Sequence, residues 1–113
     1  MKIQESVQNG VAVLALAGKL MGGPEMGEFG ERIAELKKTG IKRVVLDMGE
    51  VEWINSTGLG MIISAYTTLT RDGGGVKLAR VGDRVQNLFV ITKLVTLFDA
   101  YESVESAVTS YGK

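Results

Sequence analysis

The 113-residue chain contains neither cysteine nor histidine. Without cysteine it can form no disulfide and carries no thiolate nucleophile. Without histidine, serine hydrolases with an ordinary base and nearly every zinc site are excluded as well. The sequence therefore predicts a protein that is not an enzyme and that binds no metal.

Net charge and long apolar runs are also missing. Thirteen basic residues balance thirteen acidic ones, so no overall field attracts nucleic acid or an anionic membrane. No apolar run reaches the roughly 18 residues that a membrane-spanning helix needs, and the opening MKIQESVQNG is too polar for a signal peptide. We expect one soluble, cytoplasmic domain, residues 1–113, that contacts no nucleic acid, does not insert into a membrane and recognises a partner by local shape.

Alternating and β-branched apolar residues predict the strands. Residues 2–7 and 11–16 should form a hairpin, because Asn9-Gly10 favours a two-residue turn. The second of these strands is continuously apolar and should be buried on both faces. Further strands are expected over residues 43–48 (ending at a Gly-Glu break), 76–81 and 95–98.

Apolar residues at helical spacing predict four helices. Pro24 suits a first helical position and Thr39-Gly40 a helix end. The helices are expected from Pro24 to this stop, from Ser56 to Asp72, from Asp83 through Phe89, and over about 102–111. The resulting order predicts an α/β fold with a mixed sheet of four to five strands: an N-terminal antiparallel hairpin, then parallel strands, with helices mainly on one face.

The segment EVEWINSTGLGMII, residues 50–63, joins a strand to a helix at a serine. The first N–H groups of a helix lack intrahelical partners. The Ser56 hydroxyl can cap them, which is worth about 0.5–2 kcal/mol, and Asn55 or Thr57 can do so if the helix begins one residue either way. On position alone, plain capping by Ser56 is the favoured interpretation.

The same geometry also suits a phosphoserine. A phosphate on Ser56 would meet unpaired N–H donors and the positive end of the helix dipole. Gly58 and Gly60 each cost the helix about 0.5–1 kcal/mol relative to alanine. They either leave a bare surface on which a partner can approach Ser56 or allow close packing of helix on sheet, and the sequence favours neither.

These residues carry a family resemblance. VVLDMGEVEWINSTGLGMII, residues 44–63, resembles the signature of the STAS domain family of bacterial anti-sigma-factor antagonists, in which a strand and a loop lead into Asp-Ser-Ser/Thr-Gly-Leu/Ala-Gly. LALAGKL, residues 14–20, and the segment 73–108 extend the resemblance over nearly the whole chain. The resemblance implies the fold of that family.

It also implies a switch. In the family, the unphosphorylated antagonist binds an anti-sigma factor that is also a serine kinase, which phosphorylates the signature serine; a serine phosphatase restores it. Ser56 occupies that position. The added charge of about −1.5 to −2 should release the partner. Because ATP and metal belong to the kinase, no cofactor is expected on this chain.

The resemblance identifies a candidate partner-binding surface. It consists of Met21, Gly22, Asn55, Ser56, Thr57, Gly58, Leu59 and Gly60. Asn55 and Met21 replace acidic residues of the family pattern. An alternative therefore stays open: a constitutive scaffold or accessory subunit, stressosome-like or transporter-associated, in which Ser56 is never phosphorylated.

Three neighbouring features have plainer interpretations. The glycine-rich segment 18–23 lacks the spacing of a phosphate-binding P-loop and is expected to be a loop beside Ser56. Trp53, the only tryptophan, is assigned to packing in preference to a partner contact by two to one. Asp47, Glu50 and Glu52 could suggest paired carboxylates or a metal site, but two of the three fall in a predicted surface turn, so solvated turn charges are the favoured interpretation.

Overall fold

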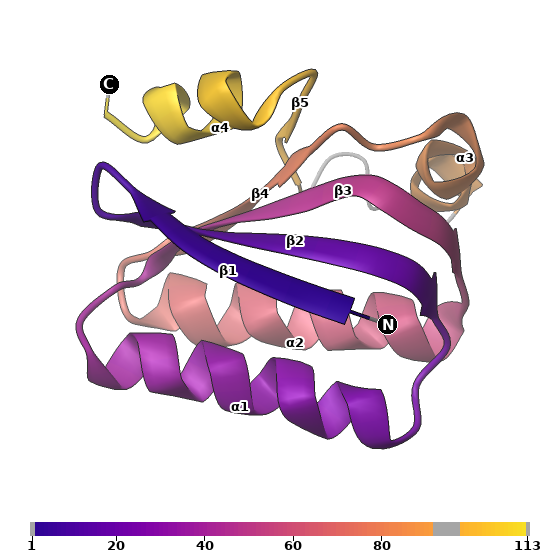
Figure 1. Cartoon of the computed structure of the whole chain (residues 1–113), viewed down its shortest axis with the longest axis horizontal. Helices are drawn as coiled ribbons and strands as arrows, with labels where there is room; N and C mark the ends of the chain where they lie inside the picture. Colours follow the sequence, from indigo (N-terminus) through magenta and orange to yellow (C-terminus); the bar gives the residue numbers. More distant parts are fainter. Residues whose placement is uncertain (1, 92–97, 113) are drawn as a thin grey trace.

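The computed structural model describes residues 2–91 and 98–112, which form a five-stranded sheet and four helices (Figure 1). The sheet has the order β1-β2-β3-β4-β5; β1 and β2 are antiparallel and the remaining neighbours parallel, as predicted. No helix within these ranges is long and apolar enough to cross a membrane. The elements are β1 (Lys2–Gln8), β2 (Val11–Leu20), α1 (Pro24–Lys38), β3 (Arg43–Ile54), α2 (Ser56–Arg71), β4 (Gly75–Ala79), α3 (Asp83–Ile91), β5 (Ala100–Tyr101) and α4 (Val104–Ser110).

The N-terminal hairpin forms where the sequence predicts it. Asn9 and Gly10 have φ angles of 52° and 77°, and a two-residue turn of this kind requires positive φ at both positions. The turn pairs Gln8 with Val11 and fixes the register of the whole hairpin. From Val11 onward β2 is almost entirely buried, which confirms the prediction of a strand covered on both faces.

Apolar side chains fill two layers, one on each face of the sheet. Figure 1 shows α1 and α2 side by side under one face and α4 on the other. The larger cluster lies between the sheet and α1 and α2, and α3 adds Val85 and Phe89 to it. The smaller cluster joins the sheet to Ala107 and Val108 of α4. The helices are thus mainly on one face, with α4 as the exception.

Strands β2 and β3 are both longer than their apolar runs. The predicted break at Gly49-Glu50 is wrong, because β3 continues to Ile54 and pairs there with Leu20. The register shifts twice along this length, between Ala15 and Ala17 and between Gly18 and Lys19, and each time β3 has one more residue than β2. Half of the predicted glycine-rich loop, residues 18–20, therefore belongs to β2, and residues 21–23 connect it to α1.

The last strand also differs from the prediction. Residues 92–97 lie outside the described part of the chain, but Phe98 is in a bend and not in a strand. Its ring packs into the core at 5.3 Å from that of Tyr66 and 5.9 Å from that of Phe89, measured between centroids. Pairing with β4 is made by Ala100 and Tyr101 instead. Phe98 is thus apolar because its ring is part of the core, and not because it belongs to a strand.

Asp47 is the only buried charged side chain in the described part of the chain, at 7% exposure. Arg80 donates to both of its carboxylate oxygens at 2.8 Å, and the Gly49 N–H donates to Oδ1 at 3.1 Å. The hydrogen bond and the charge of Asp47 raise the pKa of Arg80. A Cβ on Gly49 would overlap the guanidinium of Arg80, so a larger residue there would push the arginine away from its position over β3.

The expectation of solvated turn charges is therefore wrong for Asp47, which is buried and paired. Glu50 and Glu52 are exposed, as expected, but they belong to β3 and not to a turn. The sequence analysis did not identify Arg80 as the partner of Asp47, because Arg80 lies 33 positions later in the chain. Nothing in their sequence spacing indicates that the two side chains form an ion pair.

We expect Arg80→Ala to lower the free energy of unfolding by about 1–3 kcal/mol, because it leaves the buried Asp47 carboxylate with one donor. The control is Arg32→Ala, which removes an exposed ion pair to Glu5 and should cost less than about 1 kcal/mol. Urea unfolding of the three proteins measures both. Equal losses in the two variants would contradict a stabilising role for the buried pair.

Candidate functional site

Asn55 is the residue that caps α2. Its Oδ1 accepts a hydrogen bond from the Gly58 N–H at 2.9 Å. Its Nδ2 donates to the Met21 carbonyl at 3.1 Å, and its backbone N–H donates to the Leu20 carbonyl at 3.2 Å. One residue therefore joins the end of β2, the following loop and the start of α2. Of the three capping alternatives, the structure selects Asn55.

Ser56 is the first residue of α2, and its side chain is exposed. Within residues 2–91 and 98–112, its hydroxyl has no hydrogen-bond partner, and neither does that of Thr57. The favoured interpretation of Ser56 as a plain helix cap is therefore wrong. The first turn of α2 also holds no acidic side chain. The helix start presents a hydroxyl that the fold does not use.

The two glycines of this turn have different roles. A Cβ on Gly58 would overlap the backbone carbonyl of Leu20, so Gly58 is needed for close packing of α2 against β2. A Cβ on Gly60 would meet nothing within 4 Å. Packing inside the domain therefore explains Gly58, whereas Gly60 only leaves the helix surface bare.

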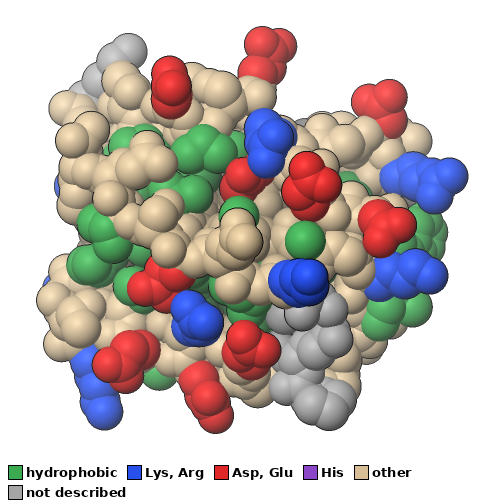
Figure 2. Space-filling model, in the orientation of Figure 1, with side chains coloured by type: hydrophobic (Ala, Val, Ile, Leu, Met, Phe, Trp, Pro, Cys, Tyr) green, Lys and Arg blue, Asp and Glu red, His purple; other side chains and the backbone are tan. Residues whose placement is uncertain are grey.

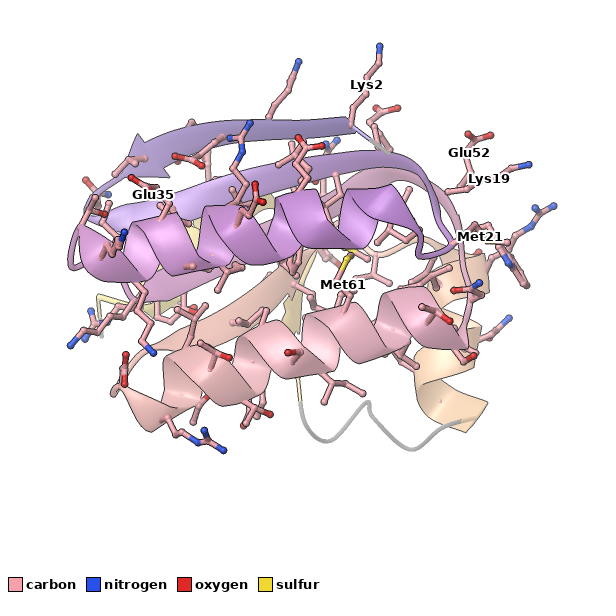
Figure 3. The ribbon with its side chains drawn as sticks, turned by 90° about the horizontal axis from the view of Figure 1, so that it is seen from below. Lys2, Lys19, Met21, Glu35, Glu52 and Met61 are labelled. Atoms are coloured by element: carbon pink, nitrogen blue, oxygen red, sulfur yellow. The ribbon has the colours of Figure 1, made fainter. Side chains whose placement is uncertain are left out.

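The candidate partner-binding residues lie at one end of the domain but differ in exposure. Met21 is 47% exposed, and Figure 3 shows it at the end where α2 begins, together with Lys19 and Glu52. Gly58 and Leu59 are buried, and Gly22 and Asn55 are partly buried. The members whose surface is exposed are Met21, Ser56, Thr57 and Gly60.

Trp53 lies at this same end and is 45% exposed, so its assignment to packing is wrong. It pairs with Lys19 across β2 and β3, while the next residue, Ile54, is 1% exposed. The pairing of β3 with β2 shifts register between Val51 and Trp53, and Glu52 and Trp53 are both exposed. Burial therefore does not alternate along this part of β3, and the sequence carried no simple signal that Trp53 is exposed.

A groove between α1 and α2 was not anticipated from the sequence. Its volume is about 370 Å³. Figure 3 shows Met61 between the two helices, where it is 6% exposed. Gly60, which has no side chain to fill the groove, lines it one helical turn from Ser56. The lining residues are Phe29, Gly30, Ile33, Ala34, Lys37, Gly60, Met61, Ser64, Ala65 and Thr68.

We expect Asn55→Ala to lower the free energy of unfolding by about 1–2 kcal/mol, because both the cap and the bond to Met21 are lost. Asn55→Asp keeps the acceptor for the Gly58 N–H and should cost less. Ser56→Ala is the matched control and should change stability by only a few tenths of a kcal/mol. Chemical denaturation measures all three. If Ser56→Ala were as costly as Asn55→Ala, Ser56 would be part of the cap in solution.

Comparison with known proteins assigns this arrangement to a family. The sequence model of the STAS domain matches residues 2–107. The chain is 26% identical over 111 residues to BtrV of Bordetella bronchiseptica, a candidate anti-sigma factor antagonist, and the match covers 98% of this chain and 95% of BtrV.

Two solved structures have the same fold. A candidate anti-sigma factor antagonist from Thermotoga maritima superposes with a TM-score of 0.90 at 19% identity, covering 98% of this chain and 95% of that one. The Bacillus protein SpoIIAA in its phosphorylated form gives 0.77 at 16% identity, covering 97% and 99%. At these identities the structural likeness shows the fold alone. Membership of the family rests on the sequence model of the STAS domain, which matches residues 2–107. The chain therefore belongs to the STAS domain family.

Proposed function

We propose that this chain is a regulatory module of the anti-sigma-factor-antagonist type, which binds an anti-sigma factor that is also a serine kinase and is switched by phosphorylation of Ser56. One observation carries the proposal: the Ser56 hydroxyl is exposed at a helix start that Asn55 already caps. A hydroxyl without a structural task can be modified and restored without unfolding the helix. The partner contacts the end of the domain that contains Ser56 and Met21.

The helix start suits a phosphate on Ser56. Phosphoserine carries about −1.5 to −2 charge at neutral pH and three strong acceptor oxygens. The positive end of the helix dipole and the first N–H groups of α2 favour an anion there. No acidic side chain of the first turn opposes it. Phosphorylation therefore changes the charge of the surface and leaves the fold intact.

The surroundings of Ser56 explain how a phosphate releases the partner. The exposed neighbours Met21 and Trp53 are apolar, so a partner that covers them also removes Ser56 from water. Burying a dianion without a compensating cation is strongly unfavourable. The open surface at Gly60 leaves room for a partner backbone or a kinase active site beside the hydroxyl.

The relatives support this proposal. BtrV is a candidate anti-sigma factor antagonist, and SpoIIAA, named an anti-sigma factor antagonist, has been solved in unphosphorylated and phosphorylated forms. Met21 and Asn55 replace acidic residues of the family pattern. In this chain Asn55 donates its amide hydrogen to the Met21 carbonyl, a bond that a carboxylate cannot make.

We expect Ser56→Asp to weaken binding to the cognate anti-sigma factor kinase at least about tenfold, because it places a charge in the covered surface. Ser56→Ala should bind like the wild-type protein. Isothermal titration with each purified anti-sigma factor kinase of the organism measures both, and Thr109→Asp, which adds the same charge on the exposed surface of α4, is the matched control. If Ser56→Asp and Ser56→Ala bound a partner equally, the constitutive scaffold would be the correct function.

The modification itself gives a second test. Incubation with the cognate kinase and ATP should add one phosphate to the tryptic peptide from Val44 to Arg71. Peptide fragmentation should place the phosphate on Ser56, because its hydroxyl is exposed and has no partner among the described residues. Ser56→Ala should remain unmodified. A phosphate found only on Thr57 would contradict the assignment.

A further inference from the structure

Two of the four exposed large hydrophobic side chains in the described part of the chain lie at the end of the domain that contains Ser56. They are Met21, at 47% exposure, and Trp53, at 45%; the other two are Val7 of β1 and Val90 of α3. Met21 is tied to the start of α2 through Asn55. Large apolar side chains exposed together mark interaction surfaces more often than single ones do.

The charges of this surface are few and of opposite sign. Residues 53–61 contain no charged side chain, but the exposed Lys19 pairs with Trp53 across β2 and β3, and the exposed Glu52 precedes Trp53. Figure 3 shows Lys19 and Glu52 at the same end of the molecule, and their charges are opposite. Over the face seen in Figure 2, acidic and basic side chains are likewise mixed, with no extensive patch of one sign. A partner therefore gains little from a strongly charged contact surface.

The polar side chain in the middle of this surface is already occupied. Asn55 uses its oxygen for the Gly58 N–H and its amide nitrogen for the Met21 carbonyl. A partner thus meets two apolar side chains, the hydroxyls of Ser56 and Thr57, and the opposite charges of Lys19 and Glu52. Because these two charges balance, contact energy must come mainly from burial of apolar area and from fit.

We propose that Trp53 is the anchor residue of the partner contact, and that the partner presents an apolar pocket for Trp53 and Met21 instead of a basic surface. The proposal rests on the proposed function and names the chemistry of the partner. A buried tryptophan covers about 150–250 Å², and tryptophan is enriched among the residues that dominate binding energy. With little net charge at the contact, the affinity depends weakly on salt.

The single tryptophan allows a direct test in the intact protein. The chain is labelled with 5-fluorotryptophan, which places one fluorine in the protein, and titrated with each purified anti-sigma factor kinase of the organism. Binding should shift the fluorine resonance and remove its difference in shift between H₂O and D₂O, because Trp53 leaves the solvent. Between 0.05 and 0.5 M NaCl, Kd should change by less than about threefold.

Variants test the energetic role. Trp53→Ala should weaken binding at least about tenfold and Trp53→Phe should restore part of it. Val7→Ala is the matched control, because Val7 is similarly exposed on β1, and it should bind like the wild-type protein. The unfolding curve of each variant shows whether it is folded.

Three results would overturn the anchor. They are a complex in which the fluorine keeps its H₂O/D₂O difference, a folded Trp53→Ala variant that binds normally, and an affinity that falls more than about tenfold with salt. If Ser56→Asp weakens binding while Trp53→Ala does not, only the anchor is wrong. If Trp53→Ala weakens binding while the Ser56 variants bind alike, the switch is wrong and the anchor stands.

If no anti-sigma factor kinase binds, the proposed function is contradicted, and a random peptide library displayed on phage decides the anchor alone. Peptides selected on the wild-type domain should be apolar and should lose binding to Trp53→Ala but not to Val7→Ala. Failure to select any peptide, selection of mainly Lys- and Arg-rich peptides, or equal binding to Trp53→Ala would overturn the proposal.

Discussion

The two hydrogen bonds of the Asn55 side chain are the interaction on which the site depends. A carboxamide can donate and accept at once, whereas a carboxylate can only accept. Asn55 therefore caps α2 through Gly58 and holds the loop through Met21 with the same group. Because the cap is complete, Ser56 has no bond to give up when it is modified. The availability of the serine follows from the identity of its neighbour.

That arrangement depends in turn on how far β2 and β3 extend. Asn55 reaches Leu20 and Met21 only because both strands continue beyond their apolar runs. The continuation of β3 begins where Arg80 crosses Gly49 and binds Asp47. At the far end of this stretch Gly58 lets α2 lie directly on β2, so that the serine sits beyond the carboxyl end of β3, the middle strand of the sheet. Backbone geometry set by two glycines and one ion pair thus positions the candidate site.

Local chemistry made much of the fold predictable. Asn9-Gly10 specified the hairpin, and helical spacing gave α2 its bounds to within a residue. The errors arose where distant residues decide local structure. Asn55, the cap of α2, also bonds to the Met21 carbonyl, which lies 34 positions earlier in the chain. In the same way, β3 continues past Gly49 beside Arg80, which lies 33 positions after its partner Asp47. Trp53 was misjudged for another reason: its residue type favours burial, and the register shift between β2 and β3 beside it breaks the alternation of buried and exposed positions.

The low net charge of the surface determines what a phosphate can do there. In a contact rich in carboxylates, one more negative group adds to an existing field, and a basic partner can neutralise part of it. Around Ser56 the exposed neighbours are apolar, and residues 53–61 carry no charge. A phosphate on Ser56 would therefore introduce most of the net charge there. Under the proposed function, desolvation of that charge would oppose binding, so the balance of charge that would make recognition insensitive to salt would also make it sensitive to a single modification.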